Sequence, residues 1–498
     1  MSLVEKSGPI LLTGGTGYIG GRLIRPLEET GRPLRVLARD PERLRPAQAP
    51  SSFVPRVAPT TEVVRGDLLD PASLAAACSG VDTAYYLVHS MGEETGAFLE
   101  SESISARNFA EAARAAGVRR IIYLGGLGRP EDRLSAHLAS RQDVGRLLRE
   151  SGAQTVEFRA SVILGSGSTS FEMIRGLVDR LPVLIAPRWV NTLAQPIAVE
   201  DVLAYLSAAL DVTLPEPCAI YEIGGADKVS YGGMMKAYAA SQGLKRVFIG
   251  VPWLSPRLSA HWLAFVTPLY YQVGRHLLEG VRNETVVTND DAARDFPQIR
   301  PMGVDAAIAR ALAKEDKAFA ETRWSDAQSS SPPARQWPGR RVGRRYMDQR
   351  VLEVDCPPDR VFGAVLCIGG SKGWYAWTWL WSLRGLLDQI SGGVGARRGR
   401  RDPTCLIPGD TVDFWRVEEV EPDRRLRLAA EMRMPGRGWL QFECDPLPNG
   451  GTRIVQTALW DPIGLAGHLY WFSMWPMHQL IFGSMLRGIA TESGCDLR

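Results

Sequence analysis

The sequence predicts a doubly wound, parallel α/β sheet that is followed by a smaller α+β domain. Short apolar runs alternate with helical patterns from Pro9 to about Ser161, which is typical of parallel strands joined by helices. The runs are apolar throughout, as expected for a sheet that is covered on both faces. Beyond Tyr346 the order changes to a strand, helices, several strands and one long helix. A chain of 498 residues can hold two or three such domains.

The first domain is expected to span residues 6–321. Its first strand ends just before Gly14, and a long helix is expected at 98–116. The region after about residue 165 mixes helices with short strands, one of them at 220–223. Insertions after the last strands of such sheets build the substrate side of the cleft. The other strands of the main sheet are expected at 34–39, 61–64, 81–88, 120–126 and 155–159.

A linker is expected at 322–345, because serine and proline crowd residues 325–333 and the apolar periodicity disappears there. The second domain then spans 346–493. Its expected helices cover 357–366, a Trp-rich stretch at 374–390, and 464–490. Its expected strands cover 350–354, 411–420, 426–434, 438–444 and 453–459.

The glycine-rich turn that begins at Gly14 carries the clearest functional signal. Glycines at positions 14, 17 and 20 connect a strand to a helix, so that a pyrophosphate could approach backbone amides at a helix N-terminus. The next strand ends in Arg39, and an arginine at that place suits a ribose 2′-phosphate. The pattern predicts a dinucleotide site that takes NADP in preference to NAD. Asp40, which follows at once, keeps NAD open as an alternative.

Composition argues against several other functional classes of protein. A net charge of +3 is too small to indicate a nucleic-acid partner. The seven cysteines are scattered without a C-x-x-C spacing, so we expect neither a disulfide framework nor a metal site, and a reducing cytoplasm fits best. The N-terminus shows no apolar leader. The apolar stretches 258–278 and 463–486 are both interrupted by polar residues or proline, which favours buried helices and leaves peripheral membrane contact open.

Up to about residue 320 the chain resembles the atypical short-chain dehydrogenase/reductases, especially their NmrA-like and complex-I-accessory-subunit-like branch. Four sequence features carry this resemblance: the glycine turn with Arg39, the Gly66-Asp67-Leu68 step, the strand end Leu87-Val88-His89, and residues 195–202. The resemblance implies a Rossmann fold. With the glycine pattern, it implies that a cofactor contacts Thr13, Gly14, Thr16, Gly17, Tyr18, Ile19, Gly20, Arg39, Asp67, Leu68, Leu87, Val88, His89 and Arg141. Asp67 could instead merely cap the helix that begins at Pro71.

The last ~150 residues resemble the bacterial DUF2867 family. The matching segments are 368–375, 384–388, 409–417 and 470–472. Their order of elements is similar to a START/polyketide-cyclase-like helix-grip fold, in which a curved sheet wraps a long C-terminal helix. That likeness implies a small hydrophobic ligand, which we expect in an apolar cavity under the helix. The tryptophans of residues 374–381 fit the lining of such a pocket and a packed core equally well.

The short-chain dehydrogenase/reductases that the chain resembles use a Tyr-x-x-x-Lys pair as their catalytic signature. The present chain departs from this signature. The matching interval holds His137 and Arg141, and glycines 125 and 126 stand where a serine is usual. Histidine can donate a proton near neutral pH, so His137 is the candidate acid and Arg141 its partner. Two functions follow as hypotheses. One is an NADP(H)-dependent oxidoreductase acting on a hydrophobic carbonyl, and the other is a non-catalytic NADP(H)-binding redox sensor or assembly factor.

Overall fold

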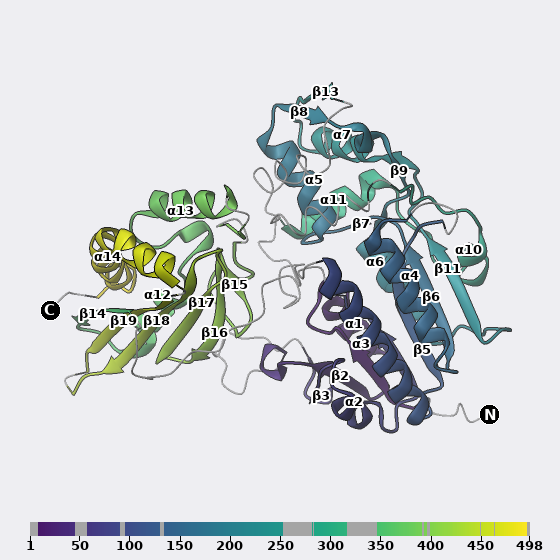
Figure 1. Cartoon of the computed structure of the whole chain (residues 1–498), viewed down its shortest axis with the longest axis horizontal. Helices are drawn as coiled ribbons and strands as arrows, with labels where there is room; N and C mark the ends of the chain where they lie inside the picture. The colour runs from purple at the N-terminus through teal and green to yellow at the C-terminus, as the bar shows by residue number, and fades with distance from the viewer. Residues whose placement is uncertain are drawn as a thin grey trace. The chain divides into compact units, whose positions relative to one another are not determined.

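The computed structural model divides into two compact units, with the boundary near residue 330 (Figure 1). The linker expected at 322–345 and the apolar stretch 258–278 lie outside the described residues. The structure describes residues 8–44, 57–89, 95–129, 134–251, 281, 283–315, 346–390, 393–395, 399–448, 450–462 and 464–495.

The first unit is built on a seven-stranded parallel sheet with the strand order β11-β6-β5-β4-β1-β2-β3. This is the doubly wound Rossmann arrangement that the sequence predicts. The strands are β1 (Ile10–Thr13), β2 (Leu34–Ala38), β3 (Glu62–Arg65), β4 (Thr83–Tyr86), β5 (Arg120–Gly126), β6 (Gln154–Ala160) and β11 (Cys218–Ile223). The helices beside them are α1 (Tyr18–Glu29), α2 (Pro71–Cys78), α3 (Thr95–Ala115), α4 (Ala136–Arg149) and α6 (Val199–Ala208).

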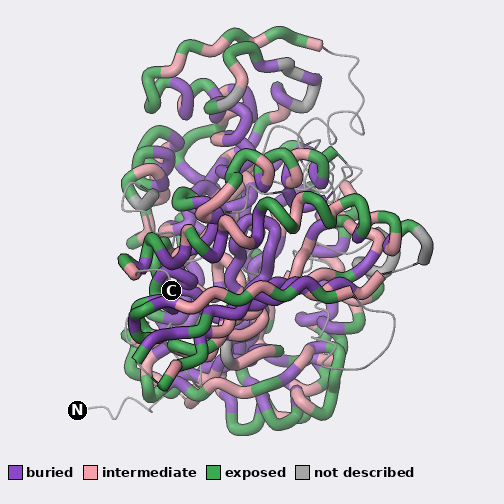
Figure 2. Tube along the Cα trace, turned by 90° about the vertical axis from the view of Figure 1, so that its left-hand side faces the viewer, coloured by how far each residue is buried: buried purple, intermediate pink, exposed green. Residues whose placement is uncertain are grey.

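Alternating side chains bury both faces of this sheet. Ile10 and Leu12 of β1 belong to one apolar core with residues of α1 and α6. Leu11, between them, belongs to a second core with residues of α2, α3 and α4. Figure 2 colours the buried residues purple, and purple segments are frequent toward the middle of the traced chain. The sheet is therefore held from both sides, which is why its strands read as continuous apolar runs.

Smaller elements follow β6 and build one side of the cleft. The strands are β7 (Ile163–Leu164), β8 (Val183–Ala186), β9 (Leu193–Ala194), β10 (Ile197–Ala198), β12 (Val229–Ser230) and β13 (Val247–Gly250). The helices are α5 (Thr169–Arg180), α7 (Tyr231–Ser241), α10 (Asp291–Asp295) and α11 (Val304–Glu315).

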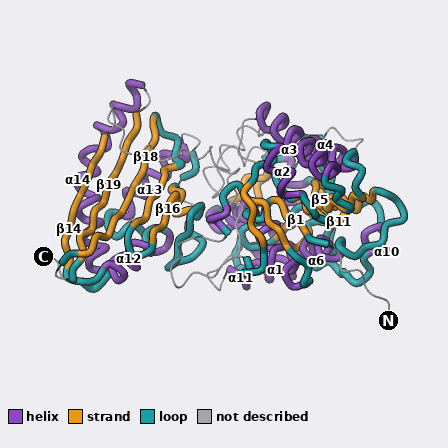
Figure 3. The backbone as a smooth tube through the Cα atoms, turned by 90° about the horizontal axis from the view of Figure 1, so that it is seen from below, coloured by secondary structure: helices purple, strands orange, loops and turns teal. Residues whose placement is uncertain are grey.

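The second unit is a six-stranded antiparallel sheet with the order β14-β19-β18-β17-β16-β15 (Figure 3). Its long helix α14 contacts β14 and β19, and α12 contacts β17, β18 and α14. The strands are β14 (Tyr346–Val354), β15 (Thr411–Val412), β16 (Trp415–Glu421), β17 (Arg425–Ala430), β18 (Gly436–Pro446) and β19 (Thr452–Pro462). The helices are α12 (Pro358–Leu366), α13 (Thr378–Ile390) and α14 (Gly464–Glu492).

Two expectations for this unit need correction. The expected helix at 374–390 begins only at Thr378, because Tyr375 and Trp377 adopt left-handed backbone angles (φ 60° and 52°). The expected strand at 411–420 is split into β15 and β16 at Asp413, which also has positive φ. The Trp cluster divides accordingly. Trp374 and Trp381 stack in the core with ring centroids 4.7 Å apart, whereas Trp377 and Trp379 are exposed.

A third correction concerns the cysteines, because Cys356 and Cys495 form a disulfide. Cys356 follows β14 and Cys495 follows α14, so the bond ties the end of the long helix to the start of the sheet. Spacing in the sequence could not show this pair, because 139 positions separate its members. The bond removes the ground for inferring a reducing compartment, so the cytoplasmic location stays a prediction. No helix within the described ranges combines the length and apolar content that crossing a bilayer requires.

The disulfide gives a direct chemical prediction. Unfolded, unreduced protein should present five titratable thiols, and reduced protein all seven. A Cys356→Ser/Cys495→Ser variant should lower the unfolding free energy of the second unit, by at most about 5 kcal/mol for so long a loop, as measured by denaturant titration. Cys218→Ser, in the first unit, is the matched control and should leave this transition unchanged. Seven thiols without reductant would contradict the bond.

Candidate active site

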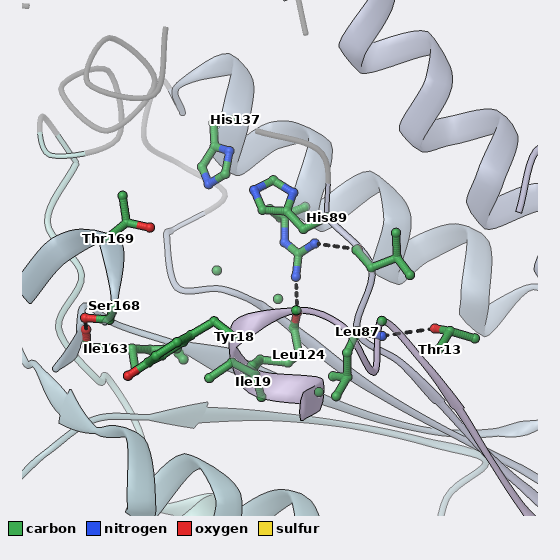
Figure 4. A pocket seen from close by; sticks show the side chains of 18 of the residues that line it. Thr13, Tyr18, Ile19, Leu87, His89, Leu124, His137, Ile163, Ser168 and Thr169 are labelled. Carbon is green, nitrogen blue, oxygen red and sulfur yellow. Dashed lines mark hydrogen bonds between the residues drawn. The ribbon is translucent and has the colours of Figure 1, made fainter. Parts of the chain in front are cut away.

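A cavity of about 440 Å³ lies at the carboxyl ends of the parallel strands, by the neighbours β1 and β4, where the order of the strands reverses its direction. Ligands of doubly wound sheets bind at such a switch point. Figure 4 shows its labelled side chains around one opening. The cavity is lined by every residue that the sequence assigned to the site: Thr13, Gly14, Thr16, Gly17, Tyr18, Ile19, Gly20, Arg39, Asp67, Leu68, Leu87, Val88, His89, His137 and Arg141.

The glycine turn needs glycine for steric reasons. Gly14 has a φ of +77°, and a Cβ added there would lie 2.6 Å from the carbonyl oxygen of Leu87. A Cβ on Gly20 would collide with the carbonyl of Gly14. The turn is closed by a hydrogen bond of 2.9 Å from the Gly17 amide to the Gly14 carbonyl. Backbone, rather than side chains, therefore forms this wall of the cavity.

The start of α1 can accept an anion. Gly17 is its N-cap, and no side chain caps the first turn. The first amides of a helix point toward its N-terminal end and carry partial positive charge. This end of the cavity therefore fits the pyrophosphate of a dinucleotide, as the glycine pattern predicts.

Two arginines stand at neighbouring strand ends on this side. Arg39 follows β2 and is exposed, and Arg65 ends β3. The Arg65 guanidinium donates to the backbone carbonyl of Arg39 at 3.4 Å. Arg65 does not itself line the cavity, but this contact places it beside Arg39, which does. Together the two side chains offer the charge that a 2′-phosphate needs.

Asp67 does not cap α2. The N-cap is Asp70, whose carboxylate accepts from the Ala72 amide at 3.1 Å. The Asp67 carboxylate instead accepts from the Leu69 amide at 3.0 Å, which fixes the loop that brings Asp67 and Leu68 to the cavity. Their contact with a cofactor remains a prediction.

The end of β4 is tied to β1 through one side chain. The hydroxyl of Thr13 donates to the Tyr85 carbonyl at 3.0 Å and accepts from the Leu87 amide at 3.3 Å. Leu87, Val88 and His89 continue from this anchor along the cavity wall. The backbone that carries His89 is thus held to the same strand that carries the glycine turn.

His89 is part of a buried hydrogen-bonded cluster. Its Nδ1 lies 2.6 Å from a carboxylate oxygen of Glu102 on α3, and the second oxygen of Glu102 accepts from the Ser140 hydroxyl at 2.5 Å. Glu102 is only 5% exposed. Burial alone would raise the pKa of this carboxyl, but the charge and hydrogen bond of His89, the charge of Arg141 and the bond from Ser140 lower it to about 2. Glu102 is therefore ionised at neutral pH. Sequence analysis missed it because it lies mid-helix without a motif.

Arg141 and His137 both come from α4 but contact different groups. Arg141 is buried and donates to the carbonyls of Leu124 and Val88, the latter at 3.4 Å. It thereby bridges the carboxyl ends of β5 and β4. His137 is partly exposed, and its ring centroid lies 4.8 Å from that of His89. In Figure 4 the two imidazoles lie next to each other. The structure thus pairs His137 with His89, whereas the sequence paired it with Arg141.

At the end of β5 the cavity is lined by backbone. Gly125 and Gly126 occupy this wall, where the reductases of the resemblance carry a serine hydroxyl. A Cβ on Gly126 would lie 2.8 Å from the Leu138 side chain, so α4 packs closely against this strand end. Among the described residues, the cavity wall therefore has no side-chain hydroxyl at this strand end.

Fold and cavity together define a dinucleotide-binding protein of the doubly wound class. Comparison with known families is more specific. Residues 14–163 match the NAD(P)H-binding family, and residues 342–485 match DUF2867, a family of unknown function. The chain is a short-chain-dehydrogenase-like NAD(P)H-binding domain fused to a DUF2867 domain.

Curated relatives match the first part of the chain only partially. A ceramide reductase of Caulobacter vibrioides is 32% identical over 206 residues, which cover 41% of this chain and 61% of the relative. A 3 beta-hydroxysteroid dehydrogenase/Delta 5-->4-isomerase of Mycobacterium tuberculosis is 31% identical over 132 residues, 24% of this chain and 32% of the relative. Among solved structures, the Bordetella bronchiseptica enzyme WbmG in complex with NAD is 17% identical, covers 65% of this chain and 98% of its own, and has a TM-score of 0.48.

Proposed function

We propose that the protein reduces a carbonyl group of a hydrophobic substrate with NADPH as the reductant. The observation that carries this proposal is that one cavity joins an anion-accepting glycine turn to a pair of imidazoles. Apolar side chains such as Leu87, Leu124 and Met173 line the same cavity and would exclude water from a reacting centre. The names of the two relatives, which refer to ceramide and to a hydroxysteroid, support a hydrophobic substrate.

When bound, the reduced nicotinamide would supply the hydride, and this chain would supply binding and proton transfer. The glycine turn and the amides of α1 would hold the pyrophosphate. Arg141 would keep the ends of β4 and β5 in register beside the nicotinamide, because its guanidinium already bridges them. The imidazoles would protonate the substrate oxygen.

The preference for NADP over NAD rests on Arg39, with Arg65 beside it. Arg39→Ala should lower NADPH affinity at least tenfold, about 1.4 kcal/mol, and leave NADH affinity within about twofold, as measured by titration calorimetry. Arg65→Ala should have a smaller effect of the same kind. Arg114→Ala, on the exposed surface of α3 and outside the cavity lining, is the matched control. Equal binding of both cofactors by the unmodified protein would contradict the preference.

The alternative is a non-catalytic NADPH-binding sensor or assembly factor. Gly125 and Gly126 favour it, because they remove the hydroxyl on which the usual reductase chemistry depends. Under this alternative the second unit would bind the hydrophobic ligand, and the cofactor would report on redox state.

Turnover separates the two functions. The protein, loaded with NADPH, is offered long-chain oxo-lipids and a 3-oxosteroid, with a short water-soluble ketone as control. We expect NADPH oxidation matched by formation of the alcohol, with kcat/KM at least about tenfold higher for the hydrophobic carbonyls, since each extra apolar contact adds to specificity. Tight NADPH binding without any alcohol product would overturn the reductase and support the sensor.

We also propose that the second unit contacts a membrane surface peripherally. Helices α13 and α14 are neighbours, because Arg384 of α13 contacts Tyr470 of α14. Each helix leaves an apolar stripe exposed. On α13 the stripe is Trp379, Leu383, Leu387 and Ile390, and on α14 it is Leu469, Phe472, Trp475 and Leu480. Aromatic and aliphatic side chains in such stripes favour the lipid interface.

Vesicle sedimentation tests the contact. The protein should sediment with phosphatidylcholine–phosphatidylglycerol vesicles, and Leu387→Glu/Phe472→Glu should reduce the bound fraction at least about tenfold, because a buried carboxylate is costly at the interface. Val351→Glu is the matched control, since Val351 is an exposed apolar residue on β14 rather than on either helix. Equal sedimentation of both variants, or none by the unmodified protein, would contradict the contact.

A further inference from the structure

The cluster of His89, Glu102 and Ser140 has the arrangement of an oriented acid–base group. Glu102 comes from α3, Ser140 from α4, and His89, the one of the three that lines the cavity, from the loop after β4. A nearly fully buried carboxylate is stable only when its charge is compensated and its oxygens are hydrogen-bonded. Here one oxygen is bonded to the imidazole and the other to the hydroxyl. The carboxylate is thereby held in one position, and so is the ring that it bonds.

The carboxylate also selects the state of the imidazole. Because Nδ1 of His89 faces an ionised carboxylate at 2.6 Å, this nitrogen carries a proton in both the neutral and the charged ring. Proton exchange is then left to Nε2, on the opposite side of the ring. The His89 side chain is 20% exposed and lines the cavity together with Gly125 and Gly126, although its Nε2 atom is itself buried.

We propose that His89, oriented by Glu102, is the proton donor in the cavity, and that His137 passes it protons from solvent. This inference rests on the carbonyl reduction proposed above. In that step the carbonyl carbon gains a hydride from the reduced nicotinamide, and the carbonyl oxygen gains the Nε2 proton of the His89 imidazolium. The C=O π bond breaks, one C–H and one O–H bond form, and the cofactor leaves oxidised by two electrons. His89 is left neutral, and a proton from water restores it through His137.

Position distinguishes the two histidines. His137 is the ring that stands at the family's Tyr-x-x-x-Lys interval, but the hydrogen bonds of Glu102 go to His89 and Ser140. His137 is partly exposed and its ring centroid lies 4.8 Å from that of His89, which suits a relay. The other titratable groups around the cluster are Arg141 from α4 and the buried phenols of Tyr86 and Tyr123, both of which interact with Glu102. Glu102 is thus a positioning residue, and His89 a catalytic one.

The test compares five variants by turnover, NADPH affinity and side-chain NMR. His89→Asn should lower turnover roughly 100- to 10,000-fold, the usual range for a lost general acid, with NADPH affinity and melting temperature nearly unchanged. His89→Ala should regain activity with added imidazole. His137→Phe should lower turnover less, about tenfold, and small buffer acids should relieve that loss. His468→Phe, in the second unit, is the matched histidine control and should change nothing.

The Glu102→Gln variant is followed by two measurements that a mere loss of packing would not change. It should shift the pH profile of turnover and change the 15N signals of His89, which in the unmodified protein should show Nδ1 protonated in the neutral ring. The outcomes separate the two proposals. An unmodified protein that reduces no carbonyl overturns the reductase and this step with it. Retained turnover in His89→Asn, or a neutral His89 protonated at Nε2, overturns the assignment of His89 alone.

Discussion

The site depends on one close approach of two backbones, between the glycine turn after β1 and the end of β4. Gly14 lies against the carbonyl of Leu87, at a distance that any side chain would block. Thr13 ties the same strand ends together through its hydroxyl. One end of the cavity is therefore built from amides of the turn, and the other from His89, two residues beyond Leu87. A shift of either strand would separate the anion-accepting end from the imidazole end.

The sequence correctly predicted those features of the site that depend on residues close together in the chain. The glycine turn, Arg39 and the strand end at Leu87 are local patterns, and all of them line the cavity. Contacts between residues far apart in the chain were not visible. Glu102 meets His89 and Ser140 across 13 and 38 positions, and nothing in a helix interior marks such a carboxylate. The disulfide spans 139 positions and was missed for the same reason.

In the second unit the errors arose where side-chain packing overrides local preference. Trp374 and the residues after it look like a helix, but the Trp374 indole donates to Asp413 at 2.8 Å and stacks on Trp381. The chain between these two tryptophans must turn sharply, and Tyr375 and Trp377 take left-handed angles to do so. The burial of two indoles offsets the cost of that strained backbone. Helix periodicity alone cannot show that indole burial outweighs backbone strain at this place.

If His89 and Glu102 act as proposed in place of a tyrosine and a lysine, the charge of the donor explains the difference. A tyrosine that gives up its proton becomes an anion, so a cation beside it helps the transfer. A histidine gives up its proton from a cation and becomes neutral. The neighbour that favours the protonated, cationic ring must therefore be an anion. Glu102 has that sign, and its ionised state is maintained by His89 from the loop after β4 and by Ser140 and Arg141 from α4. Arg141 stands at the place of the family's lysine. Its guanidinium bonds the carbonyls of Val88 and Leu124 and holds the two strand ends between which the chemistry is proposed to occur.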